Sequence, residues 1–210
     1  MSDWFRNETW TPEIREFFFA KLKRARKEGR PQYLRIQAVH LIATKHNDLL
    51  TVAEELLNQL LTEYPDNRLE KASTLSHLGE IHEHRGNTEN AIEYYRKAMD
   101  FERIFPNVTT SAYLHYSELI VKTNQVDKFK KVEKILKKRM PNQSFPLEKY
   151  KTYLLLAIIM KSQGETEKAK EYTEIAEQNA KMETSGFRYH KNLDLVVERE
   201  LELEKILSSN

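Results

Sequence analysis

The chain has 210 residues, a formal net charge of +2 and no cysteine, and 31% of its residues are charged. A net charge so close to neutral argues against a general nucleic-acid binder, and the lack of cysteine excludes disulfides and thiolate metal sites. Only five glycines and six prolines interrupt the sequence, which is typical of exposed helices with breakers kept for turns. We find neither a signal peptide nor a run of 18 apolar residues, so we expect a cytoplasmic protein outside the membrane.

The first element in the chain is a predicted helix over residues 11–28. Thr11 can cap its start and Pro12 suits its first position, where a backbone N–H is not needed. Gly29 and Pro31 follow its end. We expect this helix to cover one end of the fold.

An aromatic arm precedes this helix and contains all the tryptophan in the chain. Its large residues are Trp4, Phe5 and Trp10. Aromatic anchors are favoured at interfaces, so the arm is a possible interface with a partner or another protomer. The alternative is that it folds back over the phenylalanines at residues 17–19, which we favour because an exposed aromatic patch is a liability for a monomer.

The stretch from Thr74 to Pro106 has the pattern of two antiparallel helices joined at Gly86. Residues alternate in size along one face of each helix: Leu75, Leu78, Gly79 and His82 on the first, Ala91, Tyr95 and Ala98 on the second. The small residues let the two helices approach closely, and the large ones fill the groove beside them. This pattern resembles the tetratricopeptide repeat.

Poorer copies of the pattern lie on both sides of this stretch. The predicted hairpins span residues 32–64, 67–104, 109–140 and 146–182, and a last helix spans residues 190–207. The copies stand about 38 to 40 residues apart, against about 34 in the tetratricopeptide family. In the first copy, Gln37 and His40 occupy positions where large apolar residues are usual.

The resemblance implies an all-α fold, a right-handed superhelical array of antiparallel helix hairpins, or α-solenoid. Repeat arrays grow by adding units rather than by enlarging one core, so we expect residues 1–210 to form a single domain. The helices at residues 11–28 and 190–207 would cap its ends.

The resemblance also implies that the first helices of successive hairpins line a concave groove that binds a protein or peptide. The residues expected in this groove are Arg35, Lys45, Ser76, Glu80, Glu83, His84, Leu114, Glu118, Lys122, Leu154, Ile158 and Lys161. Acidic residues in its middle argue against the basic clamp with which some family members hold chaperone peptides. The groove either takes a ligand of mixed basic and apolar character or is covered at its apolar end by the terminal helix.

The lengthened repeats are similar to those of bacterial peptide-sensing regulators, which implies a bacterial source. Only about 30 residues precede the first hairpin. A sensor of that kind would therefore lack its output domain.

Candidate catalytic and metal-binding residues form no known motif. His77 and His82 stand five positions apart and point from different sides of a helix, which does not suit two ligands of one metal. No phosphate-binding loop, zinc-protease motif or nucleophile elbow occurs. We expect no cofactor, no metal and no enzymatic activity.

Two basic stretches, at residues 21–30 and 128–139, support an alternative function. Lysines on a helix face can contact phosphates, and a nucleic-acid-associated factor would use them. Acidic neighbours such as Asp127 and Glu133 favour an ordinary solvated face instead, so nucleic acid is an unlikely partner.

Charge order along the chain makes self-association possible, because the first helix is basic and four glutamates lie within residues 197–205. Together these patterns favour a non-enzymatic protein- or peptide-binding scaffold.

Overall fold

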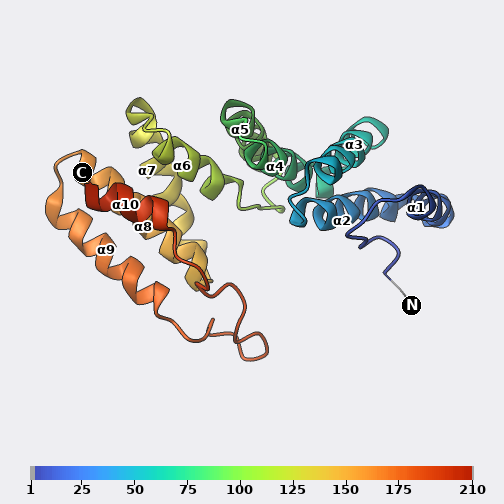
Figure 1. Ribbon diagram of the computed structural model, residues 1–210. Helices are drawn as coiled ribbons and strands as arrows, with labels where there is room; N and C mark the ends of the chain where they lie inside the picture. The colour runs from blue at the N-terminus through green and yellow to red at the C-terminus, as the bar shows by residue number, and fades with distance from the viewer. Residues whose placement is uncertain (1–2, 210) are drawn as a thin grey trace. The chain divides into compact units, whose positions relative to one another are not determined.

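The computed structural model describes residues 3–209, and every regular element in that range is helical. The chain divides into two compact units, residues 1–112 and residues 113–210. The single-domain expectation stays a prediction. The predicted all-α array of helix hairpins is confirmed (Figure 1).

The first unit contains a leading helix and two hairpins. Its elements are α1 (Pro12–Arg24), α2 (Arg30–Ala43), α3 (Asn47–Glu63), α4 (Arg68–His84) and α5 (Thr88–Ile104). Helix α2 packs on α3, α4 packs on α5, and α4 also contacts α2 and α3. Two successive hairpins therefore stack within this unit.

The second unit continues the pattern and ends with a short additional helix. Its elements are α6 (Ala112–Lys122), α7 (Phe129–Arg139), α8 (Pro146–Ser162), α9 (Thr166–Ala180) and α10 (Leu201–Ser209). The guanidinium of Arg139 lies 5.2 Å from the ring centre of Tyr113, which brings α7 against α6. Helix α8 contacts α7, α9 and α10.

Both end helices differ from their predicted bounds. Helix α1 ends at Arg24 because Ala25 is extended, and a turn over Lys27–Gly29 leads into α2. Helix α10 begins only at Leu201, so the predicted helix from residue 190 is wrong. Asp194 has a left-handed backbone (φ 49°) and its carbonyl accepts a hydrogen bond from the Leu147 amide, which interrupts any helix there.

The helical spacing of Leu193 and Val197 produced this error. Four-residue spacing places two apolar residues on one side of a helix, but Val197 is 90% exposed. Apolar periodicity alone did not show that these residues belong to a loop.

The aromatic arm folds back onto α1 and α2. Trp4 lies 5.4 Å from Phe18 and 4.9 Å from Tyr33 between ring centres, and Trp10 lies 5.4 Å from Phe18. Phe17 remains about half exposed and takes no part in this cluster. The possible interface formed by Trp4, Phe5 and Trp10 thus packs internally.

Gln37 explains how the arm is held. Its side chain is fully buried, accepts hydrogen bonds from the backbone and side-chain amides of Asn7, and donates one to the Asn7 carbonyl. A polar residue at this core position therefore has a specific partner, since buried amides must be paired.

The closest packing of α4 on α5 occurs at Gly79. A Cβ atom at this position would lie 2.7 Å from Cε1 of Tyr95. Leu78, Ala91 and Ala98 are fully buried beside this contact. The small residues of the repeat pattern do allow the two helices to meet.

Candidate functional site

The clearest candidate site lies in the second unit, on the surface that α10 contacts: α10 packs on α8 (Figure 1), and Glu202 of α10 pairs with Lys122 of α6. We call this surface the α6/α8 face and define it by Glu118, Lys122, Tyr150, Lys151 and Lys161. It joins the first helices of two successive hairpins, because Lys151 on α8 reaches Glu118 on α6. This is the side of the hairpins that the groove prediction indicated.

Three lysines of the α6/α8 face contact the terminal segment. Lys122 Nζ lies 3.1 Å from Glu202 Oε2, and Lys151 forms an ion pair with Glu200. Lys161 donates a 2.7 Å hydrogen bond to the carbonyl of Leu207, in the last part of α10. The lysines thus follow the segment from the residue before α10 almost to its end.

Tyr150 adds a polar contact at the start of α10. Its hydroxyl donates to Glu204 Oε1 at 2.7 Å and accepts from the Glu200 amide at 3.0 Å. Burial, and next the hydrogen bond to Glu204, raise the pKa of Tyr150 to about 12. Leu203 supplies the apolar anchor of α10 and is fully buried.

Glu118 forms ion pairs with two of these lysines, Lys122 and Lys151. Its carboxylate is only 5% exposed, lies 2.6 Å from Lys122 Nζ and accepts from Lys151 Nζ at 3.3 Å. A buried carboxylate requires such pairing, because an uncompensated charge in the interior is strongly destabilising. Glu118 is therefore a structural residue of the α6/α8 face. The sequence pattern had predicted it as an acidic residue of an open groove.

The neighbouring glutamates raise the pKa of two of the lysines. Burial by itself would lower the pKa of the Lys122 ammonium, but its hydrogen bonds and attraction to Glu118 and Glu202 raise its pKa above the ordinary value. Burial by itself would also lower the pKa of Lys151, but Glu118 and Glu200 raise it above the ordinary value. Both lysines are therefore charged while α10 is seated.

Arg199 ties the segment before α10 to α9. Its guanidinium pairs with Glu177 on α9 and with Glu204 at 2.6 Å. The hydrogen bond from Arg199 lowers the pKa of Glu177 below its ordinary value. This tether is exposed, so its contribution to stability is small.

The remaining predicted groove residues of the second unit are apolar and buried. Leu114, Leu154 and Ile158 are all buried, at 7% exposure or less. Sequence reasoning named Lys122 and Lys161 but missed Tyr150 and the complementary glutamates at positions 200, 202 and 204. The alternate glutamates from Glu198 to Glu204 were the available signal, and they were interpreted as a basis for self-association.

In the first unit the predicted residues are largely paired with one another or with the core. Arg35 on α2 forms an ion pair with Glu70 on α4, and Glu83 accepts a 2.6 Å hydrogen bond from the Tyr95 hydroxyl. Ser76 is buried. Lys45 is exposed and has a left-handed backbone (φ 58°), so it belongs to the turn after α2.

Glu80 and the exposed His84 lie together on one face of α4 with His77. Glu80 is 3.3 Å from His77 Nδ1 and 3.8 Å from His84 Nε2. His82 points elsewhere and stacks on Tyr94, with ring centres 5.2 Å apart. Within residues 3–209 no group of three or more potential ligands is placed to hold a metal ion.

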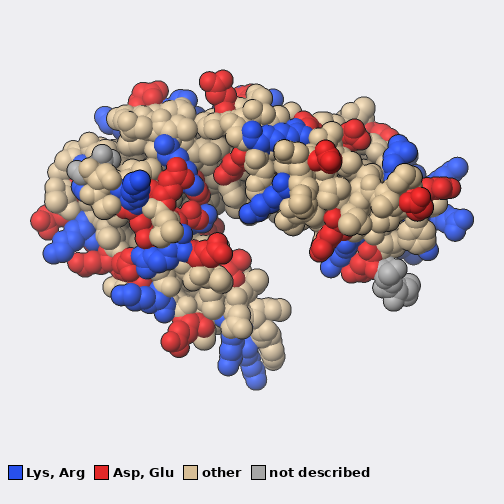
Figure 2. Space-filling view, viewed as in Figure 1, with Lys and Arg blue, Asp and Glu red and all other residues tan. Residues whose placement is uncertain are grey.

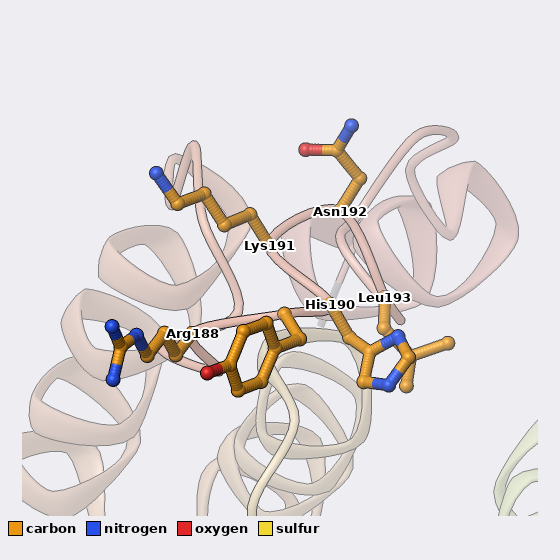
Figure 3. Close-up of a pocket in the computed structure, with 6 residues that line it drawn as sticks. Arg188, His190, Lys191, Asn192 and Leu193 are labelled. Atoms are coloured by element: carbon orange, nitrogen blue, oxygen red, sulfur yellow. The ribbon is translucent and has the colours of Figure 1, made fainter.

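The loop that precedes α10 carries a surface hollow. The hollow in Figure 3, about 540 Å³, is lined by consecutive loop residues 188–193. Lys191 and Asn192 point to one side of the loop, and His190 and Leu193 point to the other. Side chains that diverge in this way do not form a catalytic arrangement.

Charges are interspersed over the visible surface. Figure 2 shows basic and acidic side chains adjoining one another rather than gathering into one patch of a single sign. Among the described helices, none combines the length and the apolar character that a membrane crossing requires.

The paired helices define the class as an all-helical repeat protein. A tetratricopeptide-repeat family model matches residues 72–104, which cover most of α4 and all of α5. The chain therefore contains a tetratricopeptide repeat, and the predicted resemblance is confirmed at its best copy. Comparison with curated proteins and with solved structures gave no match.

Proposed function

We propose that the chain is a non-enzymatic scaffold of the cytoplasm that binds a protein or peptide on the first helices of its hairpins. One observation carries this proposal: three lysines and a tyrosine of the α6/α8 face hold a helical segment, whose own leucine is buried. A surface that holds a segment of its own chain in this way has the chemistry needed to hold a partner's segment.

Site-specific photo-crosslinking tests the proposal in the first unit. A photoreactive residue replaces Glu80 or His84 on α4, two of the predicted groove residues. Matched control positions are Asn58 on α3 and Glu89 on α5, both exposed on second helices. Partner proteins captured from the α4 positions alone would support the proposal. Equal capture from both sets, or none from α4, would contradict it.

A second candidate function is nucleic-acid binding through α7. Phe129, Val132 and Leu136 bury one face of this helix. Lysines at positions 130, 134 and 138 are exposed at four-residue spacing on another face, which suits phosphate contacts. Changing all three to Gln should remove binding of a single-stranded oligonucleotide, and that binding should weaken steeply with salt.

A further inference from the structure

Helix α10 is weakly anchored for a segment that occupies a binding surface. It has nine residues, and Leu203 is its only fully buried side chain, whereas Leu201 is 73% exposed. Isolated helices shorter than about 12 to 15 residues are marginal in water, so α10 owes its helical form to docking. A segment of this kind can leave the face and unfold in one step.

The chain before α10 permits this departure. Residues 181–200 contain no helix, and Tyr189 and Val197 are more than 80% exposed. The first part of this stretch is held by hydrogen bonds from the Ser185 amide to the Lys191 carbonyl and from the Leu147 amide to the Asp194 carbonyl. Residues 195–200 can therefore swing away while the preceding loop stays in place, once the exposed ion pair between Arg199 and Glu177 opens.

The α6/α8 face would then lack its acidic partners. Lys122 and Lys151 would keep Glu118 but lose Glu202 and Glu200, which leaves two ammonium groups around one carboxylate. Tyr150 would lose its acceptor, Glu204. The exposed face would favour a ligand that carries carboxylates at this spacing beside an apolar side chain.

We propose that the α6/α8 face binds an acidic amphipathic helix of another protein, with glutamates on both sides of a buried leucine, and that α10 is its internal competitor. This inference rests on the proposed scaffold function and names the kind of partner. The pattern that α10 and the residue before it present, Glu200, Glu202, Leu203 and Glu204, describes what that partner must carry.

A second copy of the chain is a less suitable occupant. A flexible connection of this length gives α10 an effective concentration in the mM range at its own face, on the order of that for short linkers. A second copy offers the same helix without that advantage. A longer partner helix can make the same contacts and bury more apolar surface, whereas α10 leaves its own Leu201 73% exposed.

Fluorescence anisotropy with labelled peptides tests this proposal on the full chain. The first peptide carries residues 197–209, and the second keeps only Glu200, Glu202, Leu203 and Glu204 with alanine elsewhere. A third has Gln in place of the three glutamates of the second. The chain is used as wild type and as Leu203→Asp, which displaces α10 by placing a charge at its buried anchor.

We expect Leu203→Asp to bind the first two peptides at least about tenfold more tightly than the wild type, because the competitor is removed. Glu200→Gln with Glu202→Gln is a second opening variant that leaves the leucine in place. The neutral peptide should bind about tenfold more weakly than its acidic counterpart. Hydrogen exchange in α8 and α9 should stay protected in both variants, which verifies folding.

Matched lysine variants locate the binding. In the Leu203→Asp background, Lys122→Gln should weaken peptide binding severalfold while Glu118 keeps its pair with Lys151. Lys130→Gln on α7 removes the same charge outside the face and should change nothing.

Equal affinity of wild type and opened variants, or equal binding of the neutral and acidic peptides, would overturn the proposal. Dimers that exchange α10 in the wild type would also overturn it, in favour of a second copy. If these peptides fail while α4 still crosslinks a partner, the scaffold function stands and only the acidic-helix inference falls. If both fail, the proposed function falls too.

Discussion

Tyr95 packs against Gly79 so closely that only a glycine fits. The ring is fully buried, and its hydroxyl donates to Glu83 at 2.6 Å, so it has no room to retreat from a new methyl group. The residue that marks the repeat pattern in the sequence is thus the residue that sets the contact between α4 and α5.

Gly79→Ala should destabilise the first unit. Overpacking of a buried site costs about 1 to 3 kcal/mol, whereas the gain in helix propensity recovers about 1 kcal/mol. Urea unfolding followed by circular dichroism measures the change. Gly29→Ala is the matched control, because a Cβ there meets Tyr33 only at an ordinary 3.4 Å. Equal stability of the two variants would refute the packing argument.

Gln37→Ala should release the aromatic arm. It leaves the Asn7 backbone amide without its acceptor and the Asn7 carbonyl without its donor, which costs about 1 to 3 kcal/mol, while the Asn7 side-chain amide keeps the Trp4 carbonyl. Trp4 and Trp10 are the only tryptophans, so intrinsic fluorescence reports on the arm alone. We expect a red shift with little loss of helical signal. Gln32→Ala, at an exposed position of the same helix, should leave the spectrum unchanged.

Docking of α10 should weaken at high pH through Tyr150. Its pKa is raised from 10 to about 12 in the docked state, so the neutral phenol is favoured there. Its contribution is complete below pH 10 and is lost as pH rises through about 12. Carbon-13 tyrosine NMR should show this titration, and Leu203→Asp should return the pKa toward 10. If the pKa of Tyr150 stayed unchanged in that variant, the docking of α10 would not be the cause of its shift.

The tether between Arg199 and Glu177 should weaken in acid. The pKa of Glu177 is lowered in the folded chain, so its contribution is present above the ordinary pKa of a glutamate and is lost as pH falls through the lowered value. Carboxyl NMR of the wild type should show the lowered pKa. Arg199→Gln should raise it, whereas Arg188→Gln, in the preceding loop, should not. If the pKa of Glu177 were the same in wild type and Arg199→Gln, the assignment of its shift to Arg199 would be wrong.

Local patterns in the sequence predicted the hairpins well because helix packing depends on residues close together in the chain. Gly79, Ala91 and Tyr95 identify the α4/α5 hairpin by spacing alone, and the family match covers that stretch. The same reasoning placed Lys122 and Lys161 on first helices. It failed at residues 190–200, where the spacing of Leu193 and Val197 imitates a helix that a long-range hydrogen bond to Leu147 interrupts.

The sequence by itself determined the helical repeat and the charge of each helix face. The tertiary structure decided which charges meet. Glu118 could have lined an open acidic groove, but it lies buried beneath Lys122 and Lys151, while the glutamates around α10 hold the outer side of those lysines. The spacing of residues along a helix specifies which of them share one face of that helix. Ion pairs between residues 33 to 80 positions apart depend instead on how the helices pack.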